Sequence, residues 1–129
     1  MGNFPGVVRR AVTRLATSAK EHEAAELQKE CVESGATLVC DLPDRERVRV
    51  AGTLRTVTLR PRAGVPALVA ELYDGSGSVS LTWLGRRQIA GIQPGRALVA
   101  YGRVTRDPRD GNQPVIFNPR YELRPAGAE

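Results

Sequence analysis

The sequence predicts a mainly β protein in which residues 45–124 fold into a small basic barrel of five strands. Apolar and polar residues alternate there with the period of two that strands require, and glycine, proline and aspartate separate the alternating runs. The same region holds 14 arginines and six acidic residues. The 129-residue chain has room for one such domain, with a helical extension over residues 1–44 and a short tail over residues 125–129.

The extension is expected to be helical over residues 7–34. Apolar residues recur there at spacings of three and four, and Gly35 is a natural helix terminator. Ser18 and Glu21 match a capping box, so a second helix could begin at Ala19, and one helix with a weak point is the alternative. Residues 1–44 have two more acidic than basic side chains, whereas the barrel region has eight more basic than acidic ones.

The first predicted strand changes its parity midway. Apolar residues hold even positions as far as Leu54 and odd positions from Val57 onward. Such a change turns inward residues outward unless one extra residue is inserted, so the pattern predicts a bulge at residues 55–56 or a bend at Gly52. A long strand that bends in this way can serve both halves of a barrel.

A β-hairpin is predicted next. Two alternating runs, residues 68–73 and 78–83, flank the turn sequence Asp-Gly-Ser-Gly at residues 74–77. Residues 85–92 are expected to form a short helix or a turn across the end of the barrel.

The last two strands follow the dipeptide Pro94-Gly95 and are separated by a polar loop over residues 107–114. The final strand is interrupted at Asn118-Pro119, which predicts an edge or a bulge because proline cannot donate to a ladder. The apolar residues of that strand are Val115, Phe117, Tyr121 and Leu123.

A resemblance to a known family rests on three segments: DGSGSVSLTWLG, PGRALVAYGRV and VIFNPRYEL. They resemble the anticodon-binding-type oligonucleotide/oligosaccharide-binding folds (OB-folds), and most closely the wedge domain of RecG-type DNA helicases. This resemblance covers residues 45–124. The chain with its N-terminal helices also resembles small stand-alone actinobacterial OB-fold proteins that bind nucleic acid. The resemblance implies a five-stranded Greek-key OB-fold barrel preceded by one or two α-helices.

The resemblance also implies a binding site, because nucleic acid in that family crosses the outer face of the second and third strands between two flanking loops. The matching positions are Arg49, Arg55, Tyr73, Ser80 and Thr82 on the face, Arg60 and Arg62 in the first loop, and Arg106 and Arg109 in the second. Aromatic residues make up only 5% of the chain, and the alternation turns Trp83 inward, which leaves Tyr73 as the expected stacking platform. We therefore expect single-stranded DNA or RNA to be held through its phosphates, without strong sequence specificity.

The sequence shows no catalytic, metal-binding or cofactor-binding pattern. The single histidine, His22, lies among glutamates, and two cysteines, Cys31 and Cys40, are too few for a metal cage. We therefore expect a binding protein, not an enzyme, with no cofactor and no metal. No apolar run approaches the roughly 18 residues of a spanning helix, so we expect a cytoplasmic protein without a membrane span.

The N-terminal extension leaves two roles open. Its acidic part could fold over the basic barrel and shield it. Alternatively, residues 7–34 could bind a protein partner or a second copy of the chain through Val8, Val12 and Leu15. The alternative function is thus a protein-protein interaction module that uses the barrel and the N-terminal helix and binds no nucleic acid.

Overall fold

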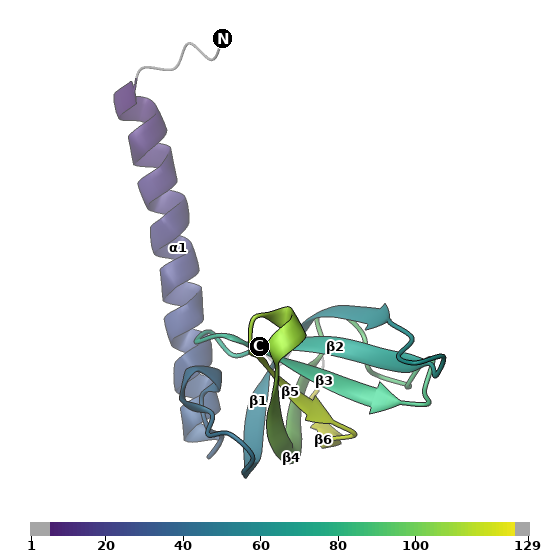
Figure 1. Ribbon diagram of the computed structural model, residues 1–129. Helices are drawn as coiled ribbons and strands as arrows, with labels where there is room; N and C mark the ends of the chain where they lie inside the picture. Colours follow the sequence, from purple (N-terminus) through teal and green to yellow (C-terminus); the bar gives the residue numbers. More distant parts are fainter. Residues whose placement is uncertain (1–5, 126–129) are drawn as a thin grey trace.

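The computed structural model describes the backbone of residues 6–125 and the side chains of residues 18–125. A long helix, α1 (Gly6–Glu33), stands at one end of a β-barrel and meets it only through its last turns (Figure 1). The strands are β1 (Arg47–Leu59), β2 (Ala67–Tyr73), β3 (Ser78–Leu84), β4 (Ala97–Asp107), β5 (Gln113–Phe117) and β6 (Arg120–Leu123). Two short 3-10 turns, η1 (Val39–Asp41) and η2 (Pro108–Asp110), complete the chain.

Five strands close the barrel. They follow the order β1-β2-β3-β5-β4, and β4 pairs again with β1. Every pairing is antiparallel except that between β3 and β5. The sixth strand, β6, pairs with β4 and is the part of the predicted final strand that follows Asn118-Pro119. The prediction of a mainly β protein with an OB-fold barrel is confirmed.

β1 serves two parts of the barrel. Its first half pairs with β4 and its second half with β2. The register with β2 passes from Leu54 to Thr56, so Arg55 is the extra residue of a β-bulge and the predicted change of parity is confirmed. At Gly52 a Cβ atom would lie 2.3 Å from the carbonyl oxygen of Tyr73, so only glycine permits this close crossing.

The core fills the barrel with the inward residues of every strand and is closed at one end by Ile89 and Ile92. The segment that carries these two residues is a turn, so the helical alternative predicted for residues 85–92 is wrong. Trp83 is 5% exposed, as the alternation predicts. Its Nε1 donates to the carbonyl oxygen of Pro119 at 3.2 Å, and its ring packs edge-on against Tyr121.

α1 is one continuous helix, so a second helix beginning at Ala19 is wrong and the single-helix alternative holds. The capping-box pattern fails as a start signal because Ser18 lies within a helix that is already formed. Gly35 terminates the segment with φ +82°, as predicted. The proposed stripe of Val8, Val12 and Leu15 lies outside the side chains that the structure describes. No helix among the described residues is long and apolar enough to cross a membrane.

The last turns of α1 pack on the outer surface of β1 and β4. Leu27 and Cys31 contact Ala51 and Val99 there. The Cys31 thiol donates to the carbonyl oxygen of Ala51 at 3.0 Å, and burial raises its pKa to about 11. This thiol therefore stays protonated and serves packing, whereas Cys40 is exposed.

Asp74 joins the β2–β3 turn to the segment after α1. Its side chain is fully buried, and its carboxylate accepts hydrogen bonds from the backbone N–H of Val39, Ser76 and Gly77 at 2.8, 2.9 and 3.2 Å. Gly75 lets α1 approach this turn, since a Cβ atom there would lie 2.3 Å from the carbonyl oxygen of Ala24. The sequence DGSG is thus a turn that also anchors the N-terminal extension.

Candidate nucleic-acid interface

Two adjoining hollows form a groove over the outer face of β1, β2, β3 and β5. Their volumes are about 470 and 310 Å³, and they share Arg60, Val69, Ser80 and Asp110. The first is also lined by Pro61, Arg62, Ala63, Thr82, Asp107, Arg109 and Val115, and the second by Thr56, Thr58, Glu71, Ser78 and Gln113. The floor is therefore strand surface, and the loops after β1 and β4 form the walls.

Both walls are built by local hydrogen bonds. In the loop after β1, Arg62 and Val65 exchange two backbone hydrogen bonds of 2.8 Å around a tip at Ala63 and Gly64, which have φ +48° and +80°. In the loop after β4, Asp107 caps η2 by accepting from the backbone N–H of Arg109 at 2.9 Å. The loops thus fix the backbone from which Arg62 and Arg109 extend their side chains.

Five of the nine residues predicted for the site line this groove: Arg60, Arg62, Ser80, Thr82 and Arg109. They come from strand β3 and from the loops after β1 and β4, in the arrangement that the resemblance implies. Thr82, however, is only 2% exposed, so a ligand in the groove would meet mainly its neighbours.

Tyr73 and Arg55 lie together beside the groove and are not among the residues that line it. The guanidinium of Arg55 is centred 3.4 Å from the Tyr73 ring centroid. A cation at that distance occupies the stacking surface of the ring. A base could stack on that face of Tyr73 only after Arg55 moved away.

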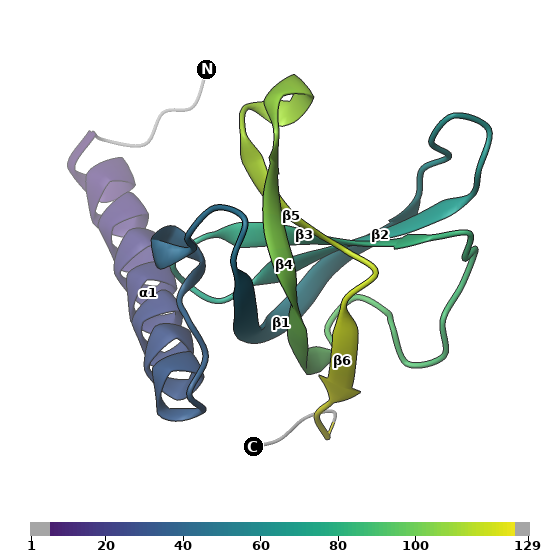
Figure 2. The ribbon, with the colours of Figure 1, turned by 60° about the horizontal axis from the view of Figure 1, so that its bottom comes forward.

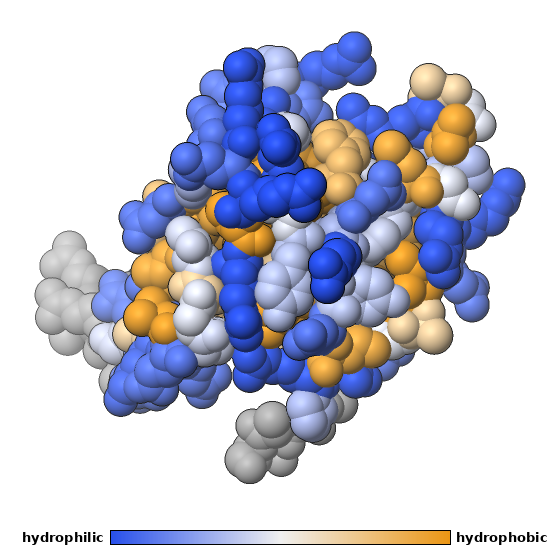
Figure 3. Space-filling view, turned by 90° about the horizontal axis from the view of Figure 1, so that it is seen from below, coloured by the Kyte–Doolittle hydropathy of each residue, from blue (hydrophilic) through white to orange (hydrophobic). Residues whose placement is uncertain are grey.

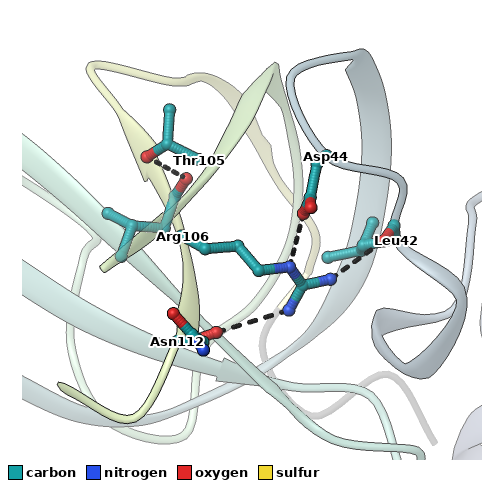
Figure 4. Close-up of polar contacts among 6 residues, drawn as sticks. Leu42, Asp44, Thr105, Arg106 and Asn112 are labelled. Atoms are coloured by element: carbon teal, nitrogen blue, oxygen red, sulfur yellow. Dashed lines mark hydrogen bonds and ion pairs between the residues drawn. The ribbon is translucent and has the colours of Figure 1, made fainter. Parts of the chain in front are cut away.

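Arg106 lies outside the groove and supports the fold. Its guanidinium forms an ion pair with Asp44 and donates to the carbonyl oxygens of Leu42 at 3.0 Å and Asn112 at 3.4 Å (Figure 4). These bonds fasten the segment before β1 to the end of β4. The arginine is therefore already occupied by partners within the chain.

Arg49 lies on a different face of the barrel. It belongs to the half of β1 that pairs with β4, where its Cα partner is Tyr101. Its guanidinium is centred 5.4 Å from the Tyr101 ring centroid, and the groove is lined by other residues. The structure thus separates Arg49 and Arg106 from the five residues that it brings together.

Phe117 lies next to groove residues, and sequence reasoning missed it. It is the Cα partner of Thr82, its side chain is 37% exposed, and the guanidinium of Arg62 is centred 5.1 Å from its ring. Tyr73 is therefore not the only aromatic side chain on this side of the barrel. The sequence signal that could have located Phe117 is Asn118, which has a φ of +50°. Odd-numbered residues therefore face outward in β5 and inward in β6.

The groove carries charges of both signs. Three arginines line it, and Glu71, Asp107 and Asp110 stand among them. The large arginine surplus of the barrel must therefore lie mostly elsewhere. Among the described residues, those that line the groove all come from the barrel, and the described side chains of α1, residues 18–33, are not among them. Within residues 18–125, no three His, Cys, Asp or Glu side chains gather as a metal site would need.

One comparison with known proteins bears on the fold. No protein-family model matches the chain, and no curated protein matches it. A solved structure of RecG bound to a three-way DNA junction is similar over 71% of the chain, with a TM-score of 0.57 and 23% sequence identity. The match spans 13% of that RecG chain. This likeness supports the fold that the sequence segments indicated.

Proposed function

We propose that this protein binds single-stranded DNA or RNA in the groove. The observation that carries the proposal is the placement of Arg60, Arg62 and Arg109 on two walls above a floor of strand residues. Guanidinium groups bind phosphate through paired N–H donors, and a groove of this kind tracks a backbone without reading base edges. The RecG of the similar structure was itself bound to DNA, which is consistent with this use of the fold.

Phe117 supplies an exposed ring beside this floor, next to Thr82. A base could stack on it alongside the guanidinium of Arg62, since both are centred within 5.1 Å of one another. Stacking tolerates every base, so the proposed binding has little sequence specificity. The proposed role is binding without catalysis, cofactor or metal.

The test is fluorescence anisotropy with a labelled single strand of about 20 nucleotides at about 50 mM salt. Arg60→Glu/Arg62→Glu should weaken binding by at least about tenfold, and by more than Tyr73→Ala does. Arg86→Glu/Arg87→Glu is the matched control, because it makes the same charge change at two exposed residues that do not line the groove. Equal effects of the two double variants would remove the loop from the site.

A second candidate function is protein interaction through α1. The observation that favours it is that Ala24, Leu27, Gln28 and Cys31 make the barrel contacts while the rest of this 28-residue helix projects away (Figure 1). Failure to bind single-stranded DNA, duplex DNA or RNA at low salt would favour this candidate over the first.

A further inference from the structure

A second basic surface lies on the outer side of β1, β4 and β6. The strands register so that Arg47 is the Cα partner of Arg103, Arg49 of Tyr101, and Tyr101 in turn of Arg120. We name this surface the arginine face and define it by Arg47, Arg49, Tyr101, Arg103, Arg120 and Glu122. In Figure 2 β4 and β6 come forward on this side, and the view from below in Figure 3 shows mainly hydrophilic side chains.

The arginines of this face form no ion pair with the described carboxylates. Among the described residues, the ion pair of Arg106 with Asp44 is the one salt bridge, and it lies elsewhere. Glu122 is the acidic member of the face, and it accepts a hydrogen bond of 3.5 Å from the Tyr101 hydroxyl. Four arginines therefore share a surface with one carboxylate.

This arrangement works against the stability of the sheet. Arg47 and Arg103 stand directly opposite each other on antiparallel strands, and like charges in that position repel. Because the described part of the fold contains nothing that offsets this repulsion, we take the arginine pair as a sign of a binding partner that does. The partner must be anionic and must present several charges at once.

We infer that the arginine face binds the phosphate backbone of duplex DNA, on a side of the barrel different from the groove. The lone ring of this face, Tyr101, is partly buried, packs against the cluster of Cys31, Ala51 and Val99, and has the guanidinium of Arg49 centred 5.4 Å from it, whereas Phe117 is exposed. The face therefore has no free stacking platform, and single strands depend on such platforms. A duplex offers phosphates alone at about one charge per 1.7 Å of its axis, which suits closely spaced arginines.

α1 sets one border of this surface. Its last turns cover Ala51 and Val99, the next outward residues along β1 and β4. The exposed part of the face is thus confined to the ends of β1 and β4 away from α1 and to β6. A duplex would contact it through a short stretch of backbone.

The test compares binding of a labelled DNA duplex of about 20 base pairs and a single strand of the same length at about 50 mM salt. Arg103→Glu/Arg120→Glu should weaken duplex binding by at least about tenfold relative to the control Arg86→Glu/Arg87→Glu. Single-strand binding should stay equal to that of the control. Thermal unfolding of Arg103→Glu verifies the fold, since this variant replaces a like-charge pair by an opposite-charge pair and should not melt below the wild type.

The outcomes separate this inference from the proposed function. The inference is wrong if the Arg103→Glu/Arg120→Glu variant loses no more duplex affinity than the control. It is also wrong if the wild-type chain binds no duplex. Duplex binding lost only in Arg60→Glu/Arg62→Glu would assign both ligands to the groove and also overturn it. Single-strand binding that survives the groove variant would instead sink the proposed function and leave the duplex result standing.

Discussion

The groove and the arginine face are two surfaces of one barrel that share β1 but arrange charge differently. The groove has walls, a floor and mixed charges, with three arginines beside Glu71, Asp107 and Asp110. The arginine face lies on three paired strands and sets four arginines against Glu122.

The comparison teaches that shape and charge surplus are separate properties in this molecule. The barrel region has eight more basic than acidic residues, yet the hollowed surface holds little of that excess. A hollow can position a flexible strand with few cations, whereas a surface without stacking platforms depends on phosphate contacts. We therefore assign different nucleic-acid forms to the two surfaces.

Gly52→Val should have the largest effect, because it removes both surfaces together. Its Cβ would lie 2.3 Å from the carbonyl oxygen of Tyr73, against backbone that cannot give way cheaply. We expect destabilisation by about 3 kcal/mol or more, measured by urea unfolding. Gly85→Val is a control in open space, although its φ of +77° adds strain. A stable Gly52→Val variant that lost only one ligand would show that the surfaces do not depend jointly on the path of β1.

Salt dependence should separate the surfaces next. Four duplex contacts predict that affinity falls about 150-fold between roughly 50 and 200 mM salt, whereas three contacts to a single strand predict a fall of about 20-fold. Anisotropy titrations of the wild-type chain at several salt concentrations give both slopes. Equal slopes for the two ligands would mean that they use the same arginines, and the comparison would fail.

The sequence predicts the parts of the fold that depend on local signals. The bulge at Arg55 follows from a change of parity, and the hairpin follows from alternating runs around DGSG. It does not predict which half of β1 meets which strand, because that pairing joins residues far apart in the chain. This is why Arg49 was expected beside Ser80 and lies instead opposite Tyr101.

The sequence likewise predicts only those residues of the candidate site that depend on local signals. The loop arginines Arg60, Arg62 and Arg109 follow from the position of turns in the sequence, and the groove contains them. Arg106 carries no signal that distinguishes it from them, since its partner Asp44 lies 62 residues away. The side chain of Phe117 faces outward because the positive φ at Asn118 separates β5 from β6. The sequence predicts both as one strand with a single alternation and therefore does not predict this orientation.

Phe117→Ala should have a smaller, selective effect on the groove. Loss of one stacked base costs roughly 1 to 3 kcal/mol, so single-strand affinity should fall about tenfold. Tyr73→Ala is the matched aromatic control and should change affinity less, since Arg55 already covers the Tyr73 ring. Duplex affinity should be unaffected by either variant. A larger loss from Tyr73→Ala would place the stacking platform at Tyr73 and require Arg55 to move on binding.

Removal of residues 1–17 should have the smallest effect on both surfaces. A truncation beginning at Asp41 would also remove Val39 from the core and Cys31 from its contact with Ala51, so the truncation is better begun at Ser18. The deleted segment ends ten residues before Leu27, which is about 15 Å along a helix. Because that exceeds the Debye length of about 8 Å at 0.15 M salt, we expect both affinities to change less than about twofold there.

The same truncation tests the role of the N-terminal helix. If Val8, Val12 and Leu15 form a self-associating stripe, light scattering should show an oligomer for the full chain and a monomer for the truncated chain. We expect this result, because α1 contacts the barrel through only its last turns and the other turns need another way to be stabilised. Tighter binding of either nucleic acid after truncation would instead support shielding. If the full chain is monomeric and both affinities are unchanged, any binding role of residues 1–17 would involve a partner other than a second copy of the chain.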